Sequence, residues 1–386
     1  MTTELLTGIA ELTTNDPRFG GVTGRLLDAA VILDGETIAW VGPAVDAPAA
    51  DRRTDLGGRA VLPGWVDAHT HLVFAGDRSD EFEHRLAGHA YEAGGIHTTV
   101  AATTAASDEE LRASLAARRA VATSAGTTTM EIKTGYGLDV AQEARLARLA
   151  AEVTEEATFL GAHVVPPGID ADGYVSLVTG DMLAAVRPFV RWIDVFCERG
   201  AFDADQSRAV LEAGRAAGLG LRVHGNQLGE GPGVRLAVEL GAASVDHCNH
   251  LSAQDVDALG SSSTVATLLP ACDLSTREPF PPARELLAAG ATLALASNGN
   301  PGTSNTTSMA FCVATAVLQM RLTVEEAVWA ATAGGARALR RTDVGAIVSG
   351  NRADLHVIDA PSVSHFAYRP GMHLTHAVWE RGQRVV

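Results

Sequence analysis

Two histidines one residue apart, His69 and His71, follow the largely apolar segment Val61–Ala68. In an extended chain alternate side chains point to the same side, so both imidazoles can face one metal ion. Neutral imidazole is the commonest protein ligand of transition metals. A lone His-x-His pair also arises by chance on a solvated strand, so the rest of the chain must decide between the two interpretations.

Short apolar strands alternate with helical segments through the middle of the chain, which predicts parallel βα units. We expect eight strands, at residues 61–69, 127–133, 158–164, 192–198, 220–224, 243–247, 264–269 and 291–297. Helices are expected between them, including residues 108–124, 141–153, 206–217 and 234–240. This α/β pattern predicts a closed (β/α)8 barrel of the TIM type over residues 61–342.

The two ends of the chain have a β-type pattern instead. Apolar stretches at residues 29–33 and 37–41 are separated by Asp-Gly and Gly-Pro turn signals, and residues 354–359 and 375–382 repeat this pattern. We therefore expect residues 1–60 and 343–386 to pair into one small β-sandwich domain beside the barrel.

The residues at the predicted strand ends are those that could do chemistry. Active sites of such barrels are built at the C-terminal ends of the strands. Those ends carry His69, His71, Lys133, Tyr136, His163, Glu198, His224, His247 and Asn298. A single histidine there is most often structural, but five histidines from four strands predict a metal and acid/base site.

Composition limits the possible partners. The formal net charge of −16 argues against binding nucleic acid or an anionic membrane, because both need clustered Lys and Arg. The four cysteines have no Cys-x-x-Cys spacing, so we expect reduced thiols. The N-terminus lacks signal-peptide features and no apolar run has the length of a membrane span, so a cytoplasmic location is expected.

Five longer motifs give the barrel a more specific character. They are Pro63–Arg78, Lys133–Leu138, Phe159–Pro167, Asp194–Glu198 and Asn300–Gly302. With these motifs in this order the sequence resembles the amidohydrolase superfamily, and within it the imidazolonepropionases, which open a ring in histidine degradation. The resemblance extends from Val61 to about Leu339, and the flanking segments also fit.

The resemblance implies one divalent metal ion, zinc or iron, bound by His69, His71, His224 and the residue at position 298. Such an ion would acidify a water that attacks the ring amide of 4-imidazolone-5-propanoate, giving N-formimidoyl-L-glutamate. The fourth strand ends without the lysine that relatives with paired metals carbamylate, which favours a single ion. Three histidines and one oxygen ligand suit zinc and iron alike.

The resemblance also implies substrate contacts. Arg78 corresponds to the clamp for the substrate carboxylate, a task that suits a planar guanidinium. Its alternative is an ion pair with a neighbouring acid, at Asp77, Asp80 or Glu81. The other implied substrate-binding residues are Tyr136, His163, Gln227, Asn300, Gly302 and Thr303. Other roles are possible for some of these residues. Tyr136 could simply cover the barrel mouth, and Gln227 could be a polar loop residue. The Asn-Pro-Gly segment could be only a turn.

Four residues are candidates for the chemical steps: His163, His247, Gln227 and Asn298. The two histidines resemble those that polarise the carbonyl or move protons, although either could instead orient a metal ligand. Lys133 and Glu198 are expected to form salt bridges at the barrel mouth. His84, His89 and His97 are expected to be solvated.

Two positions depart from the family pattern by losing a carboxylate. Asn298 stands where the family usually has a metal-binding aspartate that serves as general base, and Gln227 stands where some members have glutamate. An amide oxygen can bind a metal but cannot accept a proton at neutral pH. A general base commonly contributes about 10²- to 10⁴-fold in rate. Either histidine could take over part of this role.

Three interpretations remain. The first is a metal-dependent imidazolonepropionase, slower than its relatives, working as a homodimer as the resemblance suggests. The second is a related amidohydrolase acting on another cyclic amide or amidine, with an altered pocket around Gln227 and Asn298. The third is a barrel that binds an imidazolone but has lost turnover. A substrate screen distinguishes the second interpretation from the other two. The activity of Asn298→Asp distinguishes the third from the first.

Overall fold

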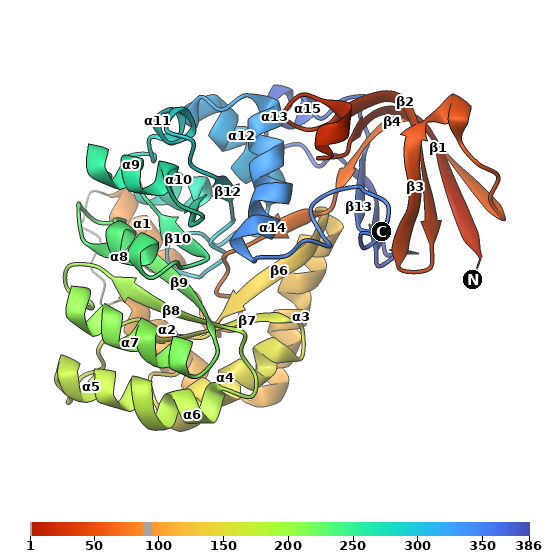
Figure 1. The fold of residues 1–386 in the computed structure, drawn as a ribbon. Coiled ribbons are helices and arrows are strands. Elements are labelled where there is room, and N and C mark those ends of the chain that lie inside the picture. Colours follow the sequence, from red (N-terminus) through yellow and green to blue (C-terminus); the bar gives the residue numbers. More distant parts are fainter. Residues whose placement is uncertain (1, 88–94) are drawn as a thin grey trace.

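Eight short parallel strands form the centre of the molecule (Figure 1). The computed structural model describes residues 2–87 and 95–386. The eight strands pair side by side in chain order. Their bounds are β5 (Trp65–Asp67), β6 (Thr127–Lys133), β7 (Glu156–Ala162), β8 (Trp192–Cys197), β9 (Gly220–Gly225), β10 (Ser244–His247), β11 (Val265–Leu268) and β12 (Leu293–Leu295).

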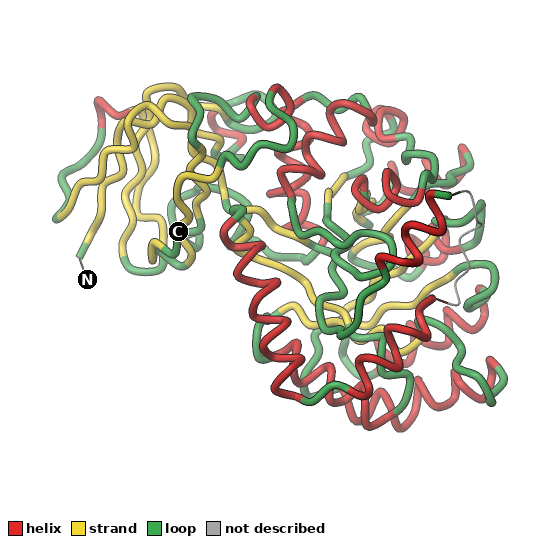
Figure 2. The backbone as a smooth tube through the Cα atoms, turned by 180° about the vertical axis from the view of Figure 1, so that it is seen from behind, coloured by secondary structure: helices red, strands yellow, loops and turns green. Residues whose placement is uncertain are grey.

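Helices surround these strands, as the view from behind shows (Figure 2). The helices that follow the first four barrel strands are α1 (Ser79–Leu86), α2 (Ile96–Ala105), α3 (Asp108–Ser124), α4 (Val140–Ala151), α5 (Ala171–Leu177), α6 (Leu183–Val186) and α7 (Ala204–Ala216). The remaining helices are α8 (Gly233–Glu239), α9 (Ala253–Gly260), α10 (Pro270–Thr276), α11 (Ala283–Ala288), α12 (Met309–Met320), α13 (Val324–Trp329), α14 (Gly335–Ala338) and α15 (His365–Tyr368). None of the described helices is long and apolar enough to cross a membrane.

The barrel closes beyond the strand ends. Within the described residues β5 and β12 share no strand ladder. Instead, the backbone N–H of His71 donates to the carbonyl of Gly299 at 2.9 Å, and the N–H of Asn298 donates to the carbonyl of His69 at 3.0 Å. The predicted (β/α)8 barrel is confirmed, and its closing hydrogen bonds lie in the loops that carry candidate site residues.

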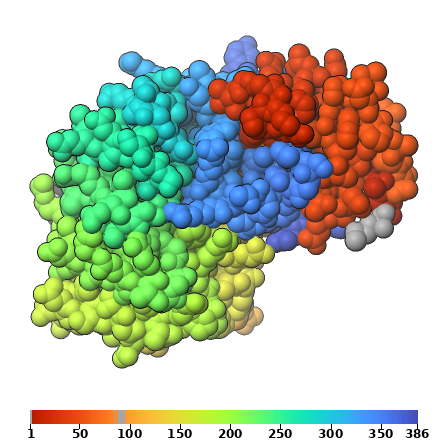
Figure 3. Space-filling model, in the orientation of Figure 1, coloured from red at the N-terminus to blue at the C-terminus, as the bar shows by residue number. Residues whose placement is uncertain are grey.

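The two ends of the chain share a seven-stranded mixed sheet, which lies beside the barrel (Figures 1 and 3). Its central strand β4 pairs in parallel with β1 and antiparallel with β13, so the expected pairing of the two ends is confirmed. The strands of this sheet are β1 (Thr3–Thr13), β2 (Arg25–Asp34), β3 (Thr37–Pro43), β4 (Arg52–Pro63), β13 (Leu355–Ile358), β14 (Thr375–Glu380) and β15 (Gln383–Arg384).

The predicted strand 61–69 is in fact two strands divided at Gly64. β4 ends at Pro63 in the terminal sheet, and β5 begins at Trp65 in the barrel. A Cβ atom at position 64 would lie 2.2 Å from the Thr128 hydroxyl oxygen, so only glycine fits where the chain passes between the two sheets. The apolar run is continuous through this point, which is why its periodicity hides the division.

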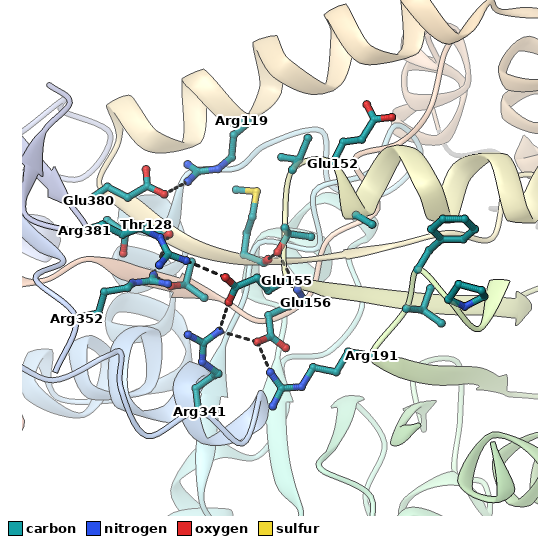
Figure 4. A pocket seen from close by; sticks show the side chains of 18 residues that line it. Arg119, Thr128, Glu152, Glu155, Glu156, Arg191, Arg341, Arg352, Glu380 and Arg381 are labelled. Atoms are coloured by element: carbon teal, nitrogen blue, oxygen red, sulfur yellow. Dashed lines mark hydrogen bonds and ion pairs between the residues drawn. The ribbon is translucent and has the colours of Figure 1, made fainter. Parts of the chain in front are cut away.

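A polar cavity of about 530 Å³ lies where the terminal sheet meets the N-terminal ends of β6, β7 and β8 (Figure 4). Arg341 donates to Glu155 at 3.2 Å and to Glu156 at 2.9 Å, and Arg381 donates to Glu155 at 2.9 Å. Arg119 and Glu380 form a further ion pair at 2.6 Å. These pairs connect the C-terminal segment to the barrel at the end opposite the histidines.

Candidate active site

Three buried histidines bring their ring nitrogens together at the C-terminal end of the barrel. One ligand atom from each of His69, His71 and His224 lies within 4.8 Å of the other two. The Nε2 atoms of His69 and His71 are 3.2 Å apart. Two nitrogens bound to one tetrahedral zinc ion at about 2.0 Å would lie about 3.3 Å apart. The observed spacing therefore fits two ligands of one ion.

Two buried carboxylates hold these histidines from behind. Asp246 Oδ2 lies 2.7 Å from His69 Nδ1, and Asp194 Oδ2 lies 3.0 Å from His224 Nδ1. Pairing at Nδ1 leaves Nε2 of each ring for a metal, which is the usual arrangement around a metal-binding histidine. His224 Nε2 is buried and has no hydrogen-bond partner among the described residues, a position that a bound ion would satisfy. The donor set fits a divalent metal.

A layer of five buried charges lies beneath the histidines. Lys133 Nζ contacts Glu131 at 2.8 Å and Asp194 at 2.7 Å, and Arg222 contacts Asp246 at 3.4 Å. All five side chains are fully buried. Three acids and two bases leave one net negative charge, which complements a cation above them. The salt bridge expected of Lys133 is present, although it lies below the barrel mouth.

Four of the buried histidines at the site are uncharged at neutral pH. Burial holds the pKa of His69, His71 and His247 well below the usual value, and burial lowers the pKa of His163 to about 4. Neutral imidazole is the form that binds metal and accepts protons. The site therefore holds metal-binding and proton-accepting groups without requiring a high pH.

A cavity of about 90 Å³ opens above the histidines. It is lined by Ile96, Phe196 and Leu228, which provide apolar surface, and by predicted site residues. The predicted residues on its wall are His71, Arg78, Tyr136, His163, Gln227, His224, His247, Asn298, Asn300 and Thr303. The structure thus gathers nearly every candidate at one place.

Comparisons with known proteins agree with this geometry. The chain is 64% identical to the imidazolonepropionase of Saccharopolyspora erythraea, with 100% of this chain and 99% of that protein covered. It is 60% identical to the imidazolonepropionase of Streptomyces griseus, with 100% of both covered. The model named "Amidohydrolase family" matches residues 197–383. The chain belongs to the imidazolonepropionase family of amidohydrolases.

Solved structures support the fold of this family member. A zinc-bound atrazine chlorohydrolase mutant from Arthrobacter aurescens superposes with a TM-score of 0.75 at 17% identity, covering 99% of this chain and 95% of that chain. An adenosine deaminase from Xanthomonas campestris with bound zinc gives 0.74 at 19% identity, covering 99% and 92%. At such identities the likeness concerns the fold alone.

Arg78, the expected carboxylate clamp of the family, lines the cavity and also forms an ion pair. Its Nε donates to Glu81 at 2.8 Å and its Nη2 donates to the other carboxylate oxygen at 2.6 Å. Gly302 lies against the guanidinium, since a Cβ there would be 2.3 Å from Arg78 Nη1. The ion pair with Glu81 is present and holds the side chain beside the cavity, and the role of Arg78 as a carboxylate clamp stays a prediction.

The Asn300–Thr303 segment is a tight turn. The Asn300 side-chain oxygen accepts the backbone N–H groups of Gly302 and Thr303, each at 2.8 Å. Its side-chain nitrogen donates to the carbonyl of Asn298 at 2.7 Å. The turn chemistry expected for Asn-Pro-Gly is present, and it fixes the cavity wall beside Arg78.

The two positions at which the family resemblance led us to expect a carboxylate both line the cavity. Asn298 has a left-handed backbone, with φ of 54°, which Asn tolerates better than most residues. The Gln227 backbone N–H donates to the Glu198 carboxylate. Glu198 was expected to form a salt bridge, but within the described residues it binds this backbone group instead.

Sequence reasoning missed the carboxylates that hold the candidate metal ligands. Asp194 lies within a recognised motif and Asp246 directly precedes His247, yet neither was given a role. The available signal was an acidic residue inside an otherwise buried strand, which demands a partner. Three histidines were expected to be solvated. Of these, His84 and His97 are exposed, and His89 lies outside the described residues.

Proposed function

We propose that this chain is a metal-dependent imidazolonepropionase that hydrolyses the ring amide of 4-imidazolone-5-propanoate to N-formimidoyl-L-glutamate. The observation that carries the proposal is the buried triad of His69, His71 and His224, of which His71 and His224 line the same cavity as Arg78. Full-length identity of 64% to a protein named imidazolonepropionase supports the substrate. We assign the reaction to histidine degradation on the same ground.

The three histidines would hold one divalent ion, zinc or iron, with the Asn298 carbonyl oxygen as a further ligand. Such an ion supplies a Lewis acid to the substrate carbonyl and acidifies the attacking water. Asp246 and Asp194 keep the His69 and His224 rings in the tautomer that presents Nε2. Zinc in two proteins of the same fold supports zinc as the first ion to test.

Substrate orientation is assigned to the cavity wall. Arg78 would bind the propanoate carboxylate through a charge-assisted hydrogen bond, while Glu81 keeps the guanidinium in place. Tyr136, Gln227, Asn300, Gly302 and Thr303 are assigned to contacts with the ring and side chain. With these contacts the ring amide would point toward the three histidines.

Proton transfer is assigned to His247 and His163, which are neutral at pH 7. One imidazole accepts a proton from the attacking water as its oxygen bonds to the amide carbon. The carbon–nitrogen bond then breaks, and the same proton passes to the departing ring nitrogen. His163 Nδ1 lies 3.0 Å from the Gly135 carbonyl and donates to it, which fixes the ring and leaves Nε2 bare to accept a proton from the attacking water.

The amide side chains of Asn298 and Gln227 favour a second candidate, a barrel that binds an imidazolone without turning it over. Both line the cavity at positions where family members can have a carboxylate. The missing base would cost about 10²- to 10⁴-fold in rate if no histidine replaced it. An altered pocket at these two residues would equally suit another cyclic amide or amidine.

Hydrolysis of 4-imidazolone-5-propanoate by the zinc-loaded protein, beside Asn298→Asp under identical conditions, tests these alternatives. We expect turnover by the parent protein, with a histidine serving as base. Turnover only after aspartate is restored would identify a binding barrel that lost its base. Absence of turnover from both proteins would overturn the proposal and direct a screen toward other cyclic amides.

We further propose that the protein works in the cytoplasm as a homodimer, as the family resemblance suggests. Light scattering on the size-separated protein should give a mass near twice 40.1 kDa. A mass of one chain at micromolar concentration would overturn the dimer. Cell fractionation tests the location.

A further inference from the structure

A buried carboxyl group stands behind His247, on the side away from the cavity. Asp273 lies in the first turns of α10, and only 1% of its surface is exposed. An oxygen of this carboxyl group lies within 4.8 Å of a ring nitrogen of His247 and of the Cys272 sulfur. Asp273 does not line the cavity, whereas His247 does.

Each of the two side chains lacks one partner. Asn249 donates to Asp273 Oδ1 at 2.7 Å, but Asp273 Oδ2 has no hydrogen-bond partner among the described residues. His247 Nδ1 is likewise buried and without a partner in the described part of the chain. Buried polar atoms are rarely left unpaired, because each such atom costs about 1–3 kcal/mol. A separation of this size suits one bridging water or a small rotation of either side chain.

The backbone at His247 is also unusual. His247 and Cys248 have left-handed φ angles of 84° and 60°. Such angles in residues other than glycine cost of order 1 kcal/mol each and persist where the surroundings fix them, often at functional sites. This bend lies at the end of β10, at a residue that lines the cavity.

We propose that Asp273 is a positioning residue that holds the inner ring nitrogen of His247, so that the outer nitrogen faces the substrate. This inference rests on the proposed function, in which His247 moves a proton between water and the departing ring nitrogen. It supplies a carboxyl group to the proton path of a chain that lacks the family aspartate at position 298. Asp273 acts through His247 and does not touch the substrate.

The chemistry of Asp273 suits this task. Burial raises its pKa to about 8, so near neutral pH the group exists in both protonation states. As carboxylate it accepts an N–H from imidazole, and as acid it donates to a bare ring nitrogen. In either state the ring keeps one orientation, and the carboxylate state is the one that leaves the outer nitrogen bare to accept a proton from water.

Steady-state kinetics of Asp273→Leu and Asp273→Asn test the inference. We expect kcat to fall about 10²-fold in the leucine variant and about 10-fold in the asparagine variant, because an amide still offers a hydrogen bond. KM and the metal content should stay near the parent values, since neither variant changes the cavity wall. A purely structural role would instead lower the amount of folded protein and leave kcat per folded molecule unchanged.

A double-mutant cycle with His247→Gln makes the test specific. If Asp273 acts only through His247, then Asp273→Asn should cause no further loss of kcat in the His247→Gln background. Fully additive losses would overturn the inference. If Asp273→Leu does not fold, the asparagine variant and its cycle decide the outcome alone.

Asp255→Asn is the matched control. Asp255 is a buried aspartate, 2% exposed, that caps α9 through Ser252 and does not line the cavity. The Asp255→Asn substitution should lower the free energy of unfolding by about 1 kcal/mol and leave kcat unchanged. Two metal ions per chain in the parent, falling to one in Asp273→Leu, would overturn the inference, because His247, Cys272 and Asp273 would then be metal ligands.

The inference and the proposed function fail in different ways. No turnover by the parent protein or by Asn298→Asp overturns the proposed function, and the role of Asp273 is overturned with it. Turnover by the parent with unchanged kcat in both Asp273 variants overturns this inference alone.

Discussion

Asp246 Oδ2 lies 2.7 Å from His69 Nδ1, and both side chains are fully buried. The carboxylate also contacts Arg222 at 3.4 Å and Lys133 at 3.8 Å. One ligand of the candidate metal site is therefore oriented by a group that two buried cations hold in place. The geometry of the site depends on residues that never reach the cavity.

Asp246→Asn should weaken metal binding. An amide can accept the His69 N–H but carries no charge, so it makes the imidazole a poorer ligand. Loss of such a partner typically costs about 10- to 100-fold in metal affinity. Competition with a chelator measures the affinity directly, with Asp255→Asn as the control for loss of a buried aspartate. Unchanged affinity would contradict the assignment of Asp246.

Arg78→Lys should raise KM for the anionic substrate by about 10- to 100-fold, because an ammonium group cannot form the forked contact of a guanidinium. The value of kcat should change less, since Arg78 lies away from the reacting amide. Arg112→Lys, at a half-exposed ion pair with Glu152, should leave KM unchanged. An equal rise in KM for a carboxamide analogue of the substrate would show that Arg78 does not recognise the carboxylate.

His356 should make stability dependent on pH. It is fully buried against Trp65 and Phe366, and burial lowers its pKa to about 3 from an ordinary 6.5. Between about pH 3 and 6.5, His356 is therefore protonated in the unfolded chain but not in the folded chain. The free energy of unfolding is therefore highest above pH 6.5 and falls as the pH is lowered toward 3. The loss due to His356 is about 2 kcal/mol between pH 6.5 and 5.

Denaturant unfolding at pH 7 and pH 5 measures this effect in the parent and in His356→Gln. Glutamine keeps a donor for Thr375, which lies 2.9 Å from the His356 ring nitrogen. The variant should lose about 2 kcal/mol less than the parent over this interval. Identical losses would assign the pH dependence to other buried histidines.

Arg341→Gln should loosen the junction between the terminal sheet and the barrel. Arg341 is one of the side chains that join the two around the polar cavity in Figure 4, where it contacts Glu155 and Glu156, and it also contacts Asp343. We expect the free energy of unfolding to fall by about 1–3 kcal/mol, because partly buried carboxylates lose a cation. The value of kcat should stay unchanged, since the junction lies at the far end of the barrel. Arg112→Gln, at the half-exposed pair with Glu152, should cost less than about 1 kcal/mol.

Much of the fold could be predicted because periodicity and turn signals are local. The eight barrel strands and the pairing of the chain ends follow from patterns that single segments carry. The break at Gly64 could not be predicted, because it depends on the approach of Thr128 from a strand more than sixty residues away. The division into residues 1–60 plus 343–386 and 61–342 stays a prediction.

The candidate site follows the same rule. His69, His71 and His224 were predicted from strand-end positions and family motifs, and the structure brings them together. Asp194, Asp246 and Asp273 were not predicted, because a buried acid has no local signature that names its partner. Their roles depend on contacts between different strands, which only the folded chain displays.

The hydrogen bonds from His71 to Gly299 and from Asn298 to His69 close the barrel with the same backbone that carries the metal ligands. The junction that closes the barrel therefore lies at its chemical centre. An ion bound by His69, His71 and His224 would hold this junction closed. Metal loading should therefore make the barrel more resistant to unfolding. A substitution that disturbs the loop at Asn298 consequently acts on the mechanical integrity of the barrel as well as on its chemistry.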